Sequence, residues 1–178
     1  MTELTKTISN TATFEEAIAF TQSLLEKMES HQLSEVDIQK AIASLVEFPN
    51  GARGFFVTYL TTDSSLADHP SPGVINALAS SPEIVGDLLV KNLAMSSAMA
   101  ITHLRNHNSD LAESSRRVTR RTQQLIKLLN SPNITNLLAQ LAESVKTKSG
   151  KYQDFLQKWG YDQEQLEAIA SSFDIPTK

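Results

Sequence analysis

Helix-start signals recur along this chain at short intervals, and they leave little room for any other kind of element. A capping pattern, in which the first side chain accepts a backbone N–H and the fourth reaches back, occurs at residues 13–16, 34–37 and 162–165. Serine precedes a proline that suits the first helical position at residues 71–72, 81–82 and 131–132. The chain is therefore predicted to consist of consecutive helices.

Apolar residues between these signals recur every three or four positions, which is the period of a helix with one buried face. Such stripes run through residues 14–28, 38–46, 137–145 and 166–173. Gly150 and Gly160 stand where a left-handed residue can close a helix. We predict an all-α fold, a single-domain helical bundle of about eight helices.

One domain is expected from the length of 178 residues. Residues 1–150 form the bundle in this prediction, and residues 151–178 form a C-terminal helical hairpin packed on the same domain. Trp159 and Tyr161 flank the corner of that hairpin and are expected to pin it to the body.

The helix predicted at about 83–107 is apolar nearly all round and should run buried through the middle of the bundle. Its narrow polar strip is expected to consist of Asp87, Lys91, Ala94, Ala98 and Arg105. The small residues at 94–100 let a neighbouring helix approach closely, or leave room for a ligand. Five polar residues interrupt this stretch, so it reads as a helix of a soluble protein rather than a bilayer span.

Residues 50–62 are ambiguous between helix and strand. The stretch Phe55 to Thr62 has strand-like composition, but no second strand pattern lies nearby to pair with it. We expect a helix that begins at Asn50, and the strand remains the alternative. The glycine-containing turn before it, with Arg53, resembles an anion-holding turn, although a plain connection between helices also requires glycine.

Composition excludes several classes of function. The chain has no cysteine, so disulfides, thiolate metal sites and cysteine nucleophiles are absent. A formal charge of −4 argues against a protein whose whole surface binds nucleic acid. The N-terminal residues lack the apolar core of a secretory signal, and we expect a cytoplasmic protein.

Charge is unevenly distributed along the sequence. Residues 1–70 carry −6 and residues 91–130 carry +5, and four of the six arginines lie within residues 111–129. On a helical wheel, Arg116, Arg120 and Lys127 face water opposite the core stripe, and Arg117 and Arg121 lie on one shoulder. The core stripe is predicted to contain Leu111, Ser115, Val118, Thr122, Leu125, Ile126 and Leu129.

The two arginine pairs are expected to differ in role. Arg116 and Arg120 form a solvated face that Glu113 steadies, and Arg117 and Arg121 form a fork facing a groove. The residues predicted to contact an anion or a partner are Arg117, Arg121, Arg116, Arg120, Arg53 and Arg105. Plain solvation or internal pairing, docking of a protein, and binding of a phosphate all remain open for them.

Catalytic and metal-binding patterns are weak. His103 and His107 have the spacing of two metal ligands and Asp110 follows, but no glutamate lies inside the spacing and no other acid cluster is near. No glycine-rich phosphate loop or nucleophile elbow occurs. We therefore expect no metal, with His103 and His107 as weak candidates, and no cofactor; whether the protein is an enzyme stays open, and a non-enzymatic role is favoured.

These observations predict a protein that acts by association, as a self-associating protein or a small regulatory or adaptor module. Its basic helix would meet an acidic surface of a protein partner or of a second copy. The alternative is a binder of, or enzyme acting on, a small anionic phosphate or carboxylate ligand. Weak nucleic-acid binding is a third reading, and no membrane contact is expected.

Overall fold

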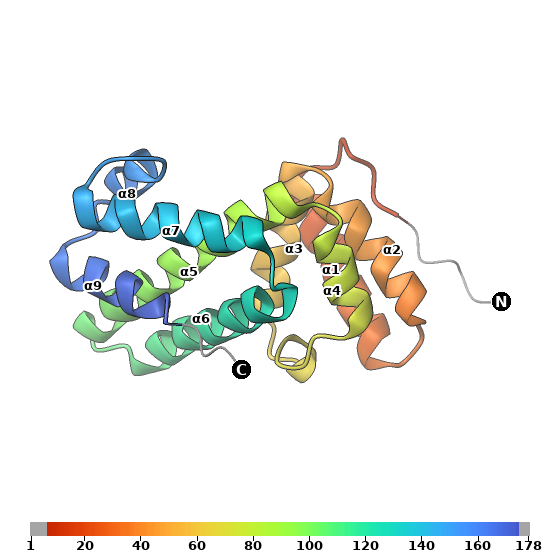
Figure 1. The fold of residues 1–178 in the computed structure, drawn as a ribbon. Coiled ribbons are helices and arrows are strands. Elements are labelled where there is room, and N and C mark those ends of the chain that lie inside the picture. The colour runs from red at the N-terminus through yellow and green to blue at the C-terminus, as the bar shows by residue number, and fades with distance from the viewer. Residues whose placement is uncertain (1–6, 175–178) are drawn as a thin grey trace. The chain divides into compact units, whose positions relative to one another are not determined.

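The computed structural model describes residues 7–174, and every regular element in that part of the chain is helical (Figure 1). Nine α-helices and one 3-10 turn are present there, against about eight helices expected. The all-α prediction is confirmed. The chain divides into two compact units, Met1–Leu88 (unit 1) and Leu89–Lys178 (unit 2). The boundary proposed from the sequence at residue 150 stays a prediction.

Unit 1 is built from pairs of packed helices. Its elements are α1 (Phe14–Glu29), α2 (Glu35–Val46), α3 (Pro49–Thr61), the 3-10 turn η1 (Ser65–Ala67), α4 (Pro72–Ala79) and the first turns of α5 (Pro82–Arg105). α1 packs most extensively on α3, and α2 packs on α4 and α3. The largest fully buried side chains of this unit include Ile42, Leu45, Phe55, Phe56 and Tyr59.

The predicted capping pairs start three helices. Reciprocal side-chain and backbone bonds are present at Thr13–Glu16 before α1, Ser34–Asp37 before α2 and Asp162–Gln165 before the last helix. Helices also begin at the predicted prolines, but neither Ser71 nor Ser131 makes the expected capping bond. The fixed φ of proline is already helical, so these helices start without that bond.

α3 settles the ambiguity of residues 50–62 in favour of a helix. It begins at Pro49 rather than at Asn50, and its N-cap residue makes no side-chain bond. The expected glycine-containing turn is therefore wrong, because both glycines lie inside the helix. A Cβ at Gly54 would lie 2.5 Å from the Ala17 Cβ, so this glycine lets α3 approach α1 closely. Burial of the aromatic residues at helical spacing overrides their strand preference.

Unit 2 contains the remainder of α5 and four further helices. These are α6 (Ser109–Leu129), α7 (Pro132–Thr147), α8 (Gln153–Trp159) and α9 (Gln163–Ser172). α6 returns antiparallel alongside α5 (Figure 1), and the Ser96 and Thr119 hydroxyl oxygens lie 2.8 Å apart between them. α9 joins α5 through Gln165, whose Nε2 donates to Thr102 Oγ1 at 2.9 Å.

The exposed strip of α5 differs from the predicted one. Ala94 and Ala98, expected to face water, are fully buried, whereas Met99 and Leu104 are 40% and 41% exposed. These two alanines are buried because their small side chains let neighbouring helices pack closely against α5. At Ala98, for example, the Gln165 side chain of α9 reaches the backbone carbonyl. Among the described residues, α5 alone is long and apolar enough to cross a membrane. In its most apolar stretch, 56% of the helix is buried within the structure.

Helices α8 and α9 occupy the segment predicted as a C-terminal helical hairpin, and their packing as one hairpin on the same domain stays a prediction. Gly160 caps the end of α8 with φ 61°, as predicted, whereas the left-handed residue that caps the end of α7 is Lys148 and not Gly150. Trp159 is 50% exposed, so the expectation that it pins the hairpin is wrong. The buried residues of this segment are Tyr152, which precedes α8, and Leu156, which lies within it. Trp159 is the last residue of α8, where the chain turns away, and this leaves its ring accessible.

Candidate partner-binding surface on α6

α6 carries sharply different side chains on its two faces. Arg116, Arg120 and Lys127 are exposed, as predicted, and the buried face consists of Ala112, Arg121, Thr122, Leu125 and Ile126. Leu111 was expected in the core stripe but is 47% exposed. Ala112 occupies the buried position in that first turn instead, so the stripe begins one residue later than predicted.

Three basic side chains lie along the exposed face of α6. Arg120 Nη2 lies 2.8 Å from Glu113 Oε1, and Arg116 Nη1 lies 3.8 Å from Glu113 Oε2. The hydrogen bond from Arg120 lowers the pKa of Glu113. One carboxylate is therefore shared by two arginines. Leu128, 45% exposed, borders this face. We call Arg116, Arg120, Lys127 and Leu128 the basic ridge.

A shallow groove of about 390 Å³ runs beside the basic ridge, between α6 and α9 and over α5. Ala100, Ile101 and Ala168 supply its apolar lining, and Arg116 and Arg120 line the α6 side. The sequence predicted that Arg117 and Arg121 would face a groove. Arg121 is instead only 2% exposed, so a molecule at the surface does not reach it.

Hydroxyl groups in this groove are already used by the protein. Each donates to a backbone carbonyl of its own helix: Ser97 to Leu93 at 2.7 Å, Ser171 to Glu167 at 3.0 Å, and Ser172 to Ile169 at 2.6 Å. The groove therefore offers a ligand two arginine side chains above apolar surface, with few spare hydrogen-bond donors.

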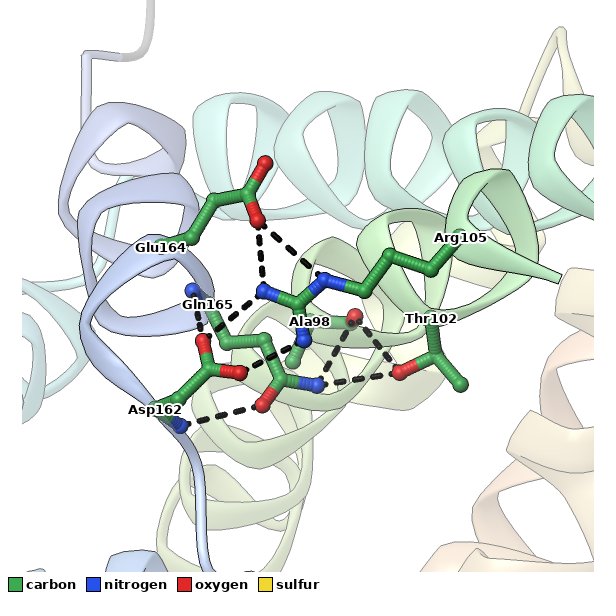
Figure 2. Close-up of polar contacts among 6 residues, drawn as sticks. All are labelled: Ala98, Thr102, Arg105, Asp162, Glu164 and Gln165. Atoms are coloured by element: carbon green, nitrogen blue, oxygen red, sulfur yellow. Dashed lines mark hydrogen bonds and ion pairs between the residues drawn. The ribbon is translucent and has the colours of Figure 1, made fainter.

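Arg105 holds one end of the α9 wall in place (Figure 2). Its guanidinium contacts both oxygens of Asp162, at 2.5 and 3.1 Å, and Glu164 Oε2, at 2.5 and 3.2 Å. Hydrogen bonding to Arg105 lowers the pKa of Asp162 to about 2, and the two acids raise the pKa of Arg105. The predicted anion contact is therefore occupied by two carboxylates of the same unit.

The other end of α9 is held by α6. Gln123 Nε2 donates to the backbone carbonyl of Ser172 at 2.9 Å. Together with the Arg105 cluster and the Gln165 contact with Thr102 (Figure 2), this bond fixes both ends of the groove wall. The sequence did not indicate this wall, because Ala168, Ser171 and Ser172 carry no chemical signal by themselves.

The remaining candidate residues lie elsewhere. Arg53 belongs to α3 in unit 1, and its guanidinium carbon lies 5.2 Å from the centre of the Phe14 ring. His103 lies in the last turn of α5, and His107 follows that helix with φ 57°. Within residues 7–174, no group of three or more His, Cys, Asp or Glu residues is placed to hold a metal ion.

Comparison with known proteins places the chain in a family. A model of the family described as "Uncharacterised conserved protein UCP020893" matches residues 13–175, and the chain therefore belongs to that family. Neither a curated protein nor a solved structure matches the chain. The basic ridge and its groove are thus interpreted from their own chemistry.

Proposed function

We propose that this member of the family acts by protein association, and that the basic ridge of α6 contacts an acidic protein surface. The observation that carries the proposal is three exposed cations on one face of α6, with an exposed leucine on the adjoining shoulder of the helix and a groove with apolar lining beside Arg116 and Arg120. From Arg116 to Lys127 the ridge spans about 16 Å along the helix axis. Arginine and apolar side chains are typical of contacts that lose water on binding.

The balance of charge supports a protein partner rather than a site for a single anion. Within residues 7–174, Glu113 is the one acid that pairs with Arg116 and Arg120, so an acidic partner adds ion pairs to two arginines that share a single carboxylate. Opposite charges speed encounter and select the partner, and apolar contact at Leu128 and in the groove adds affinity.

Reversing the ridge tests this proposal. The variant R116E/R120E/K127E is expected to lose at least tenfold in association, measured by sedimentation velocity and by affinity capture from the cells of origin. Its matched control, K146E/K151E/K158E, changes the same charge at exposed lysines of unit 2 outside the ridge. If the ridge variant keeps both its oligomeric state and its captured partners, the proposal is wrong.

A small phosphate or carboxylate ligand is the second candidate, favoured by the two arginines that line one groove. The internal use of the groove hydroxyls argues against it. Thermal-shift measurements with phosphorylated and carboxylate metabolites separate the two proposals, because a ligand at 100 times its Kd adds about 2.7 kcal/mol to the free energy of unfolding. No response from any metabolite removes this candidate.

A further inference from the structure

Charge is divided between the two units themselves. Unit 1 carries four Lys and Arg residues against twelve Asp and Glu residues, a formal charge of −8. Unit 2 carries twelve against eight, a formal charge of +4. The acidic surface that the basic ridge requires is therefore present in every copy of this protein.

Unit 1 has a groove with the complementary character. It lies between α1 and α3 and has a volume of about 490 Å³. Ile18, Leu25 and Val57 provide apolar lining, and Val57 is 44% exposed although it is a large apolar residue. A partly exposed apolar lining of this kind loses water favourably when another side chain covers it.

The charged residues of this groove are two glutamates. Glu26 and Glu29 stand one helical turn apart on α1, both are exposed, and neither forms an ion pair within residues 7–174. Nearby hydroxyls are already used, since Thr58 donates to Gly54 at 2.9 Å and Thr61 donates to Val57 at 2.5 Å. The groove thus presents two available carboxylates beside apolar surface.

We propose that the α1–α3 groove of one copy receives the basic ridge of α6 from a second copy. This inference rests on the proposed function and names its partner. Arg120 and Lys127 meet Glu26 and Glu29, and Leu128 covers the apolar lining. The contact is a helix laid into a groove, with specificity set by charge.

Ridge and groove are different patches on the same chain, so the contact joins unlike surfaces. Two such contacts related by a twofold axis close a dimer, whereas a repeated single contact extends into longer assemblies. Both arrangements respond in the same way to charge changes, and the test does not depend on which of them forms.

Charge exchange between the two patches tests the inference by sedimentation velocity over a range of concentrations. The ridge variant R120E/K127E and the groove variant E26K/E29K are each expected to associate at least tenfold more weakly than the wild type. An equimolar mixture of the two restores association, because each reversed patch then meets its opposite. The matched control E15K/E47K makes the same charge change at exposed acids of unit 1 outside the groove and leaves association intact.

The outcomes separate this inference from the proposed function. If R120E/K127E loses association or captured partners while E26K/E29K behaves as the wild type, the ridge binds another protein and the groove is not its partner. A wild type that stays monomeric also overturns the inference. If neither variant changes any association, the proposed function fails as well. Circular dichroism checks folding, and the neutral variant E26Q/E29Q replaces E26K/E29K if the reversal unfolds the chain.

Discussion

Asp162 makes two kinds of contact at the start of α9. Its carboxylate accepts the backbone N–H of Gln165 at 3.0 Å, which caps the helix, and it also binds Arg105. The bond to Arg105 is the main cause of its low pKa, about 2 against an ordinary 3.8. Asn is also a good capping residue, so the variant D162N keeps the cap and removes the charge and one of the two oxygens that accept from Arg105.

The lowered pKa of Asp162 predicts a pH dependence of stability. As the pH falls below about 4, the unfolded chain takes up the proton first, because its carboxyl has the higher pKa. The stabilisation is complete above that pH and disappears as the pH falls through about 2. D162N is therefore expected to lose less stability than the wild type between pH 6 and pH 3, measured by denaturant unfolding. D154N, at an exposed acid of α8, should follow the wild type, and equal losses in all three proteins would contradict the prediction.

Among single elements, α6 was the most predictable, since its strong amphipathic pattern places Arg116, Arg120 and Lys127 in water. The pattern failed at the shoulders of the helix. Arg117 and Arg121 both stood on one shoulder of the wheel, and only tertiary packing decided that Arg121 would be buried. The same limit applied to α5, where Ala94 and Ala98 are small enough to be buried by neighbouring helices that a single sequence does not place.

This contrast between neighbouring arginines can be measured. Removing the buried Arg121 side chain takes away packing by its stem and leaves its former contacts unsatisfied. We expect R121A to lower the free energy of unfolding by about 2–3 kcal/mol, whereas R120A, at an exposed position, changes it by less than about 0.5 kcal/mol. Thermal and denaturant unfolding of both variants provide the comparison. Equal effects would mean that burial does not distinguish these two positions.

For the whole molecule, the sequence indicated the acidic and basic regions but not the boundary between the units. That boundary at residues 88 and 89 falls inside the continuous helix α5, where no loop or proline marks it and where Gly86 and Asp87 are simply part of the helix. The α1–α3 groove could not be predicted either, because Glu26, Glu29 and Val57 line a common groove only once α1 packs on α3. Local patterns therefore predicted the helices and the charge, and tertiary packing created both grooves.

Salt provides the last prediction, because it separates the charged and apolar contributions to association between copies. Raising NaCl from 0.1 to 1 M shortens the Debye length from about 10 to about 3 Å, so a contact between ridge and groove should weaken at least tenfold. The variant E26Q/E29Q/R120Q/K127Q keeps the shape of both patches without four of their charges. It should associate weakly and respond little to NaCl in sedimentation velocity experiments. Association that strengthens in sulfate and is indifferent to NaCl in both proteins would point to a purely apolar contact and exclude the charge pairing.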